Sequence, residues 1–307
     1  MKNRGQDCVE INTKGMCAKY VKIALWKAGY SPNNGDFAPG VSPARLLGPW
    51  LEKAGFNNIT NELPDGRWAA PGDVIVYKKI DDPSGAGHVD IRTYDGYVSD
   101  FFETYLPVTQ FEVIGIYRKF YDPLPEIRMR AFLRVIRSRE AKSVLAAYGD
   151  TETYRTLPEI GHKIKLFDNF STHPFSDNPN SSNSASGAYG TLLATWKRYV
   201  VGTEKLRPWT PVADGEQKFS PKIQDRISVA AMELHLGVGY ASNKGITELG
   251  LVRMGKIEEA AKLLATKLPY QWPSLPGGSQ SDPKYGVSQM LQDYDKYFSA
   301  MRKEINQ

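Results

Sequence analysis

The chain has 307 residues, which exceeds a typical single domain, and its 41% hydrophobic and 24% charged residues are ordinary for a folded protein. Two cysteines exclude a disulfide framework and a four-thiolate metal site, and we expect no metal and no other cofactor. No apolar run approaches the roughly 20 residues of a membrane span, and the start MKNRGQDCVEINTKG lacks the apolar core of a secretory signal. We therefore expect two domains, synthesised in the cytoplasm without a signal peptide.

The net charge differs between the two parts of the chain. Residues 1–122 carry 14 Lys and Arg against 15 Asp and Glu, a net charge of −1, whereas residues 123–307 carry 25 against 19, a net charge of +6. The second part therefore prefers an anionic partner. Its basic residues are scattered and form no basic-aromatic motif, so nucleic acid is not the expected partner. The anionic bacterial wall explains the bias equally well.

The first part reads as helices followed by an antiparallel sheet. Residues 17–28 predict a helix ended by Gly29, and residues 42–55 predict a second helix. Short β-rich runs then predict four strands, with YDGY as a hairpin turn between the second and the third: 73–79, 88–94, 97–102 and 112–120. This order indicates an α+β fold.

A domain border is expected near residue 123. The segment YDPLPEI (121–127) places two prolines between a strand-like run and a helix-like run. We therefore assign one domain to residues 1–122 and a second, mostly α-helical domain to residues 123–307. Helix-like patterns in the second domain cover 128–147, 190–201, 221–236 and 256–266. A polar stretch at 171–190, rich in Ser and Asn, is either disordered or lines a binding site.

Cys17 is the candidate nucleophile of the first domain, because the positive end of a helix favours a thiolate. His88, the only histidine before residue 162, starts a predicted strand and is the candidate base. Asp100 follows across the hairpin and is the candidate for orienting the imidazole, although Asp90 or Asp95 could take that place. The alternative is that Cys17 is a small buried residue of an apolar helix face, or is bonded to Cys8.

These residues carry a resemblance. The segments GMCAKYVKIALWKAG, PGDVIVYKK and GAGHVDIRTYDGYVSD resemble the papain-like CHAP and NlpC-type wall peptidases and amidases, including type VI secretion amidase effectors, over most of residues 14–120. The resemblance implies a papain-like domain in which Cys17 is the nucleophile, His88 the base and Asp100 the orienting acid.

Glu140 is the candidate acid of the second domain. It lies in a run whose apolar residues follow helical spacing, and a glutamate shielded by such residues has a raised pKa that suits it to protonate a leaving oxygen. Taken alone this is a weak signal, since most glutamates on helices are solvated.

A second resemblance covers nearly all of residues 130–300. The segments REA, LFDNFSTHPFSDNP, SASGAYGTLLATWKRY, KFSPKIQDRISVAAMEL, WPSLPGG and YGVSQM resemble the lambda-type phage endolysins in order and spacing. The resemblance implies a lysozyme-like fold that cleaves the glycan between N-acetylmuramic acid and N-acetylglucosamine. It implies that Glu140 is the general acid and base and that Gln224 and Asp225 are structural hydrogen-bonding residues. It also implies a sugar cleft lined by His173, Tyr189 and the loop from Ser186 to Gly190.

One position departs from that family. A Gln commonly follows the Tyr of this loop, whereas here Gly190 follows Tyr189, which puts one sugar contact in doubt.

The number of carboxylates separates two glycan chemistries. A hydrolase ordinarily uses a second carboxylate, whereas the lambda type uses one acid and closes a 1,6-anhydro ring with the sugar's own hydroxyl. Asp150 and Thr156 lie ten and sixteen residues after Glu140, close to the spacing of T-even type lysozymes, so Asp150 is a possible second carboxylate. The same segment could be a polar hairpin. Hydrolase and lytic transglycosylase both remain open at this point.

The combined interpretation is a bifunctional peptidoglycan hydrolase. The first domain would cut an amide bond of the stem peptide and the second the glycan. One alternative is a non-catalytic protein that binds the wall or a partner, and another is a first domain that acts on proteins. We expect action in the periplasm or cell wall after delivery by phage lysis or a secretion apparatus. A bacterial effector of this kind would have an immunity protein as partner.

Overall fold

The computed structural model describes residues 15–30, 43–63, 65–104, 106–108, 110–157, 163–176, 184–201, 219–234, 247–267 and 272–305. Cys8 lies outside these residues. The chain divides into two compact units, Met1–Leu106 with Gln110–Tyr121 (unit 1) and Pro107–Thr109 with Asp122–Gln307 (unit 2).

Unit 1 places helices before an antiparallel sheet, as the sequence predicts. Its helices are α1 (Cys17–Lys27) and α2 (Gly48–Lys53), with short 3-10 turns η2 (Ala44–Leu46) and η3 (Gly66–Trp68). The one helix predicted over 42–55 is wrong, because its described residues form η2 and then the separate, short α2. The strands are β1 (Asn57–Asn58), β2 (Val74–Lys79), β3 (His88–Arg92), β4 (Tyr97–Val98), β5 (Phe102–Glu103) and β6 (Phe111–Arg118). They pair in the order β1-β6-β2-β3-β4-β5, every pair antiparallel.

The predicted hairpin between β3 and β4 is confirmed, because Ile91 pairs with Val98 and Arg92 with Tyr97. The single strand predicted over 97–102 is wrong. The chain turns at 99–101, where the Ser99 N–H donates to the Phe101 carbonyl, and returns as β5. Residue 100 therefore lies in a turn and does not extend the hairpin opposite β3.

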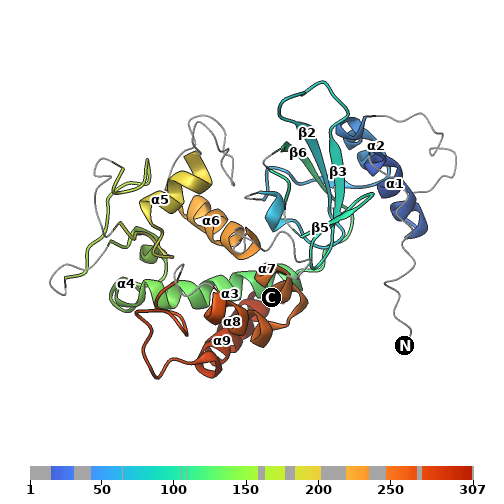
Figure 1. Cartoon of the computed structure of the whole chain (residues 1–307). Helices are drawn as coiled ribbons and strands as arrows, with labels where there is room; N and C mark the ends of the chain where they lie inside the picture. Colours follow the sequence, from blue (N-terminus) through green and yellow to red (C-terminus); the bar gives the residue numbers. More distant parts are fainter. Residues whose placement is uncertain are drawn as a thin grey trace. The chain divides into compact units, whose positions relative to one another are not determined.

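The core of unit 1 forms between the helices and the sheet (Figure 1). One face of α1 is buried, and Val21 and Leu25 lie on this face in the C-terminal part of the helix. They join residues of α2 and apolar side chains of the central strands, such as Val76 and Val89. Each such side chain contributes roughly 1.5–3 kcal/mol when it leaves water. This packing holds the start of α1 against β3.

The described residues of unit 2 are mostly helical. The elements are α3 (Leu124–Glu140), α4 (Lys142–Tyr148), η4 (Thr151–Arg155), α5 (Leu193–Trp196), a π-helical turn η5 (Lys197–Val201), α6 (Pro221–Leu234), α7 (Glu248–Met254), α8 (Ile257–Lys267) and α9 (Val287–Ile305). The helices predicted over 221–236 and 256–266 are found as α6 and α8, and the one predicted over 190–201 is found as α5 followed by η5. The described ends differ from the predicted ends by at most three residues, and 235–236 lie outside the described residues. The helices α7 and α9 were not predicted.

The long helix α3 is the centre of unit 2 and packs against α7 and α9 (Figure 1). Phe132 on α3 is fully buried and meets the ring of Tyr294 on α9 edge to face at 6.4 Å. The sequence predicts one helix over 128–147, but the helix breaks at Ala141, whose φ of −117° and ψ of 34° are not helical. Glu140 is therefore the last residue of α3 and not an interior helix residue.

Candidate active sites

Cys17 and His88 come together in unit 1 as the sequence predicts. Cys17 is the first residue of α1 and His88 is the first residue of β3. The side chain of Cys17 hydrogen-bonds to the His88 imidazole. Both residues are 6% exposed, and Cys17 belongs to the apolar core cluster. The thiol thus has both a base beside it and the burial of a core residue.

The carboxylate that holds His88 is Asp90, not Asp100. His88 Nε2 lies 2.9 Å from Asp90 Oδ1. The two residues are separated by one position on β3, so their side chains point to the same face of the sheet. Since Nε2 faces Asp90, Nδ1 is the ring nitrogen left to exchange a proton with the thiol.

Asp100 lies beside the start of α1. Its Oδ2 accepts a hydrogen bond of 3.1 Å from the N–H of Met16, and its Oδ1 accepts one from the hydroxyl of Ser99. The predicted role failed because the turn at 99–101 redirects this carboxylate to the backbone preceding Cys17. Asp100 holds the chain next to the nucleophile instead of the imidazole.

The environment of His88 favours its charged form. Burial alone would lower the pKa of His88, but the hydrogen bonds and charges of Asp90 and Cys17 outweigh burial and raise the pKa to about 10. The ring is further enclosed by Phe101, which stacks at 5.5 Å, and by Tyr77 and Phe111. An imidazolium beside a sulfur is the arrangement that stabilises a thiolate.

Glu103 is a group of this site that the sequence analysis missed. Burial and the charge of Asp90 raise the pKa of Glu103 to about 7, against the opposing charge of His88. Its position follows from the turn that separates β4 from β5, and the sequence offers no local signal for that turn. The site therefore holds two carboxyl groups, of which Asp90 carries the contact with His88.

Glu140 lines a cavity of about 430 Å³ in unit 2. The described residues around it come from α3 and α4, the end of η4, the loop before α5 and the segment after α8. They include Arg139, Lys142, Thr156, Gly187, Gly190 and Ser274. Among the described lining residues, Glu140 is the only carboxylic acid. Arg139 and Lys142 give the same cavity positive charge.

The carboxyl of Glu140 is about half protonated near pH 7. Burial raises the pKa of Glu140 to about 7, while hydrogen bonds from Ser274 and the charge of Arg139 act in the opposite direction. The N–H of Ser274 donates to Glu140 Oε1 at 2.9 Å, across 134 residues of sequence. Sequence spacing gave no indication of Ser274 as a partner.

The three residues expected to line a sugar cleft do not do so through their side chains. His173, Ser186 and Tyr189 are each at most 1% exposed. His173 contacts the Thr191 carbonyl through Nε2 at 3.0 Å and packs against Phe219, and burial lowers its pKa to about 4. A neutral polar side chain with an internal partner satisfies its hydrogen bonds without reaching the cavity.

The loop itself still reaches the cavity. Ala185, Gly187 and Gly190 line it, whereas the hydroxyl of Ser186 donates to the Ser184 carbonyl and that of Tyr189 donates to Asp225 Oδ1 at 2.6 Å. The loop therefore presents backbone and small residues to the cavity and turns its larger polar side chains inward.

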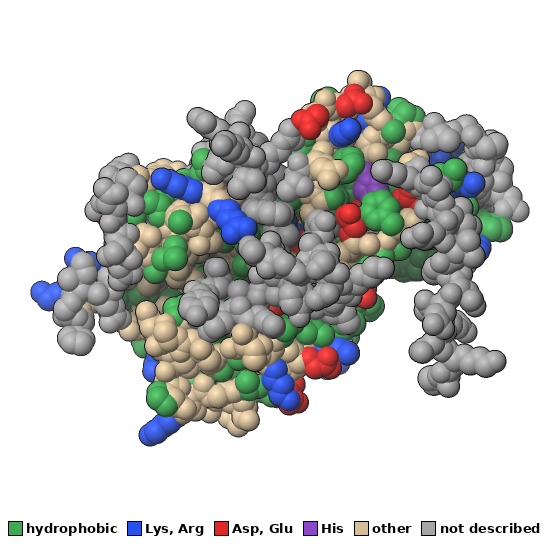
Figure 2. Space-filling view, in the orientation of Figure 1, with side chains coloured by type: hydrophobic (Ala, Val, Ile, Leu, Met, Phe, Trp, Pro, Cys, Tyr) green, Lys and Arg blue, Asp and Glu red, His purple; other side chains and the backbone are tan. Residues whose placement is uncertain are grey.

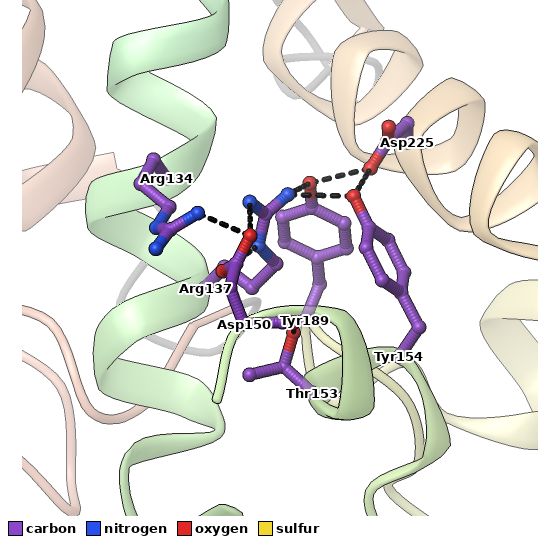
Figure 3. Close-up of polar contacts among 7 residues, drawn as sticks. All are labelled: Arg134, Arg137, Asp150, Thr153, Tyr154, Tyr189 and Asp225. Atoms are coloured by element: carbon purple, nitrogen blue, oxygen red, sulfur yellow. Dashed lines mark hydrogen bonds and ion pairs between the residues drawn. The ribbon is translucent and has the colours of Figure 1, made fainter. Parts of the chain in front are cut away.

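Asp150 belongs to a network of charged and aromatic groups (Figure 3). Arg137 Nη2 donates to Asp150 Oδ2 at 2.8 Å, Arg137 Nε donates to Oδ1 at 3.1 Å, and Arg134 forms a second ion pair with Oδ2. Asp150 is not among the described residues that line the Glu140 cavity. A carboxylate held by two guanidinium groups is suited to a structural role, which argues against Asp150 as the second carboxylate.

The other end of this network joins α3 to α6. Arg137 Nη1 donates to the hydroxyl of Tyr154 at 2.6 Å, and the hydroxyls of Tyr154 and Tyr189 both donate to Asp225 Oδ1 (Figure 3). Gln224 accepts from the N–H of Ala188 and donates to the carbonyls of Tyr154 and Phe219. The expected structural roles of Gln224 and Asp225 are confirmed.

Other classes of site find no support in the part of the chain that the structure describes. No group of three or more His, Cys, Asp or Glu is placed there to hold a metal ion. None of the described helices combines the length and the apolar character that crossing a bilayer requires. On the face drawn in Figure 2, Lys and Arg side chains are scattered and do not gather into one patch.

Comparison with known proteins identifies the second part of the chain. The family model described as Endolysin matches residues 130–301, a segment that contains Glu140, its cavity and the network around Asp150. No curated protein and no solved structure matches the chain. Since the matched segment covers more than half of the 307 residues, the protein belongs to the Endolysin family, whose members degrade peptidoglycan.

Proposed function

We propose that unit 2 cleaves the glycan of peptidoglycan with Glu140 as general acid and base. The observation that carries this proposal is a carboxyl at a pKa of about 7, the only one among the described lining residues of a cavity inside the segment that matches the Endolysin family. A general acid is most effective when its pKa lies near the working pH. The positive charge of Arg139 and Lys142 suits an anionic polymer.

The chemistry we propose is that of a lytic transglycosylase. Glu140 protonates the glycosidic oxygen, the bond from that oxygen to the muramic acid C1 breaks, and the sugar's own O6 attacks C1. The O6 proton returns to the Glu140 carboxylate, so a 1,6-anhydro end forms and no water is consumed. A hydrolase would ordinarily use a second carboxylate about 5–9.5 Å away. The ion pairs that hold Asp150 argue against that role for it.

For unit 1 we propose cleavage of an amide bond in the stem peptide. The Cys17 thiolate attacks the carbonyl carbon, the His88 imidazolium gives its proton to the leaving amine, and water then hydrolyses the thioester. Asp90 holds the ring in place and stabilises its charged form. The hydrogen bond between Cys17 and His88 supports this proposal, which concerns residues outside the family match.

A second candidate for unit 1 is a domain that binds the wall without cutting it. The observation in its favour is that Cys17 is 6% exposed and packs in the apolar core, as a structural thiol does. Delivery by phage lysis or by a secretion apparatus, and the existence of an immunity protein, stay predictions.

Mass spectrometry of digested peptidoglycan tests the proposal. Wild-type protein should release fragments with 1,6-anhydro ends and newly separated stem peptides, and the double variant Cys17→Ala, Glu140→Gln should release neither. If the double variant clears purified wall as fast as the wild type, the catalytic proposal is wrong. Reducing ends in place of anhydro ends would show a hydrolase.

A further inference from the structure

The two oxygens of the Glu140 carboxyl have different neighbours. Oε1 accepts the N–H of Ser274 at 2.9 Å, and the Ser274 hydroxyl also hydrogen-bonds to this carboxyl. A backbone N–H can only donate, so Oε1 must present a lone pair to it. The carbonyl oxygen of a carboxylic acid is a better acceptor than its hydroxyl oxygen, so in the neutral acid this N–H favours the proton on Oε2.

Oε2 faces the position where Gly190 has no side chain. A Cβ placed on Gly190 would lie 3.2 Å from Oε2, closer than nine in ten real Cβ contacts. Gly190 and Glu140 both line the 430 Å³ cavity. Oε2 therefore borders the cavity at position 190, where any residue other than glycine would place a Cβ atom.

We propose that Ser274 and Gly190 are positioning residues that make Oε2 the proton-donating oxygen of Glu140. Ser274 fixes Oε1 as an acceptor, and Gly190 leaves the space into which the glycosidic oxygen of the substrate comes. The proton moves from Oε2 to that oxygen while the electron pair of its bond to C1 stays with it. The O6 hydroxyl later returns a proton to Oε2. This inference rests on the proposed role of Glu140 as general acid.

The departure noted in the sequence takes on a physical meaning. Where the family commonly has Gln after the loop tyrosine, this chain has Gly190, which has no side chain to contact the Glu140 carboxyl. The φ of Gly190, +58°, also favours glycine for backbone reasons alone, so a test must separate strain from contact.

Gly149 is the matched control for Gly190. Its φ is +88°, and no described atom lies within 4 Å of the place of its Cβ. Its ψ of 179° lies in a backbone region that is nearly exclusive to glycine, so an alanine there brings at least as much backbone strain without touching the acid. The control for Ser274 is Ser143, which lines the same cavity and is exposed.

The experiment compares glycan cleavage by Gly190→Ala and Gly149→Ala across pH, with thermal unfolding as a check on folding. We expect Gly190→Ala to lower kcat by about 10²-fold, in the range for a displaced general acid, and Gly149→Ala to stay within about threefold of the wild type. Equal rates for the two alanine variants, with Glu140→Gln inactive, would overturn this inference and leave the proposed function standing. An active Glu140→Gln would instead overturn the proposed function.

A second variant keeps the test decisive if Gly190→Ala does not fold. Ser274→Ala removes a hydrogen bond that lowers the pKa of Glu140, so the basic limb of kcat/KM should move to higher pH. The charged groups that line the cavity around Glu140, Arg139 and Lys142, are unchanged in this variant. Ser143→Ala should leave the limb in place. Ser274→Ala keeps the backbone N–H, so a limb that stays in place in both serine variants would contradict a role for the Ser274 hydroxyl in holding the carboxyl.

Discussion

Burial acts on both candidate sites but leaves a charged imidazole in unit 1 and a carboxyl that is partly neutral near pH 7 in unit 2. In unit 1 burial works against the charge on His88, yet the Asp90 carboxylate and the Cys17 sulfur raise the pKa to about 10. In unit 2 burial raises the pKa of Glu140 to about 7, and the partners that oppose it are Ser274 and Arg139. A directly bonded partner of opposite charge therefore decides whether a buried group stays ionised. One chain thus holds a charged imidazole in one unit and a carboxyl that is partly neutral near pH 7 in the other, which is what the proposed acyl transfer and glycan cleavage require.

Substitution of Glu140 or Cys17 is expected to have the largest effect, and it tests most directly whether the two sites act independently. Glu140→Gln should lower glycan cleavage by about 10³-fold, because a general acid contributes about 10²- to 10⁴-fold, and should spare cleavage of the stem peptide. Cys17→Ala should do the reverse. Muropeptide analysis checks both, with exposed Glu259→Gln as control. Loss of both activities in either single variant would contradict two independent sites.

The network behind the unit 2 cavity is expected to give the next largest effect. Arg137→Ala removes one of the two guanidinium groups that hold Asp150 and the larger of the cationic charges that act on Asp225, and should lower the free energy of unfolding of unit 2 by about 3–5 kcal/mol. Lys256→Ala is the control, since its ion pair with Glu259 is solvent-exposed, lies outside the network and is worth about 0–1 kcal/mol. Denaturant unfolding measures both. Similar losses for the two variants would show that the network is not a structural anchor.

Asp90 and Asp100 offer a sharper test of unit 1. Asp90→Asn should lower stem-peptide cleavage by about 10²-fold and lower the pKa of His88, because it removes the charged partner of the ring. Asp100→Asn keeps a hydrogen-bond acceptor for Met16 and should cost less than about tenfold. NMR titration of His88 follows the pKa. A larger effect of Asp100→Asn would return the orienting role to that residue.

The ion pair between His88 and Asp90 also links the stability of the folded protein to pH. The folded pKa of His88, about 10, lies above its ordinary value of 6.5. The stabilisation from the pair is therefore fully present below pH 6.5 and is lost as the pH rises through 10. In Asp90→Asn most of this dependence should disappear from the unfolding free energy measured between pH 6 and 10. An unchanged dependence would mean that another group carries it.

Several features of the fold and of the sites could be predicted because their signals are local. Cys17 starts a helix and His88 starts a strand, and both were identified from flanking residues and from periodicity. The turn at 99–101 has no glycine or proline to mark it, so one strand was predicted where two exist. That turn moved Asp100 away from His88.

Features that depend on tertiary contacts could not be predicted. Ser274 reaches Glu140 from 134 residues away. His173 and Tyr189 are polar residues of a Ser- and Asn-rich region, yet the fold supplies internal partners and buries them. Helix α9 did carry a signal, since buried Met290 and Tyr294 are four residues apart, but its many polar residues obscured the pattern.

The most direct test of the central claim is one digestion of peptidoglycan by the wild-type protein at pH 6 and at pH 8, with both products quantified by mass spectrometry. With a pKa of about 7 for Glu140, the protonated fraction falls about tenfold over this range, so anhydro ends should form about ten times more slowly at pH 8. Stem-peptide cleavage should not fall, because His88 with a pKa of about 10 stays charged. Parallel loss of both products, or no loss of either, would contradict the claim that His88 stays charged while Glu140 loses its proton over this pH range.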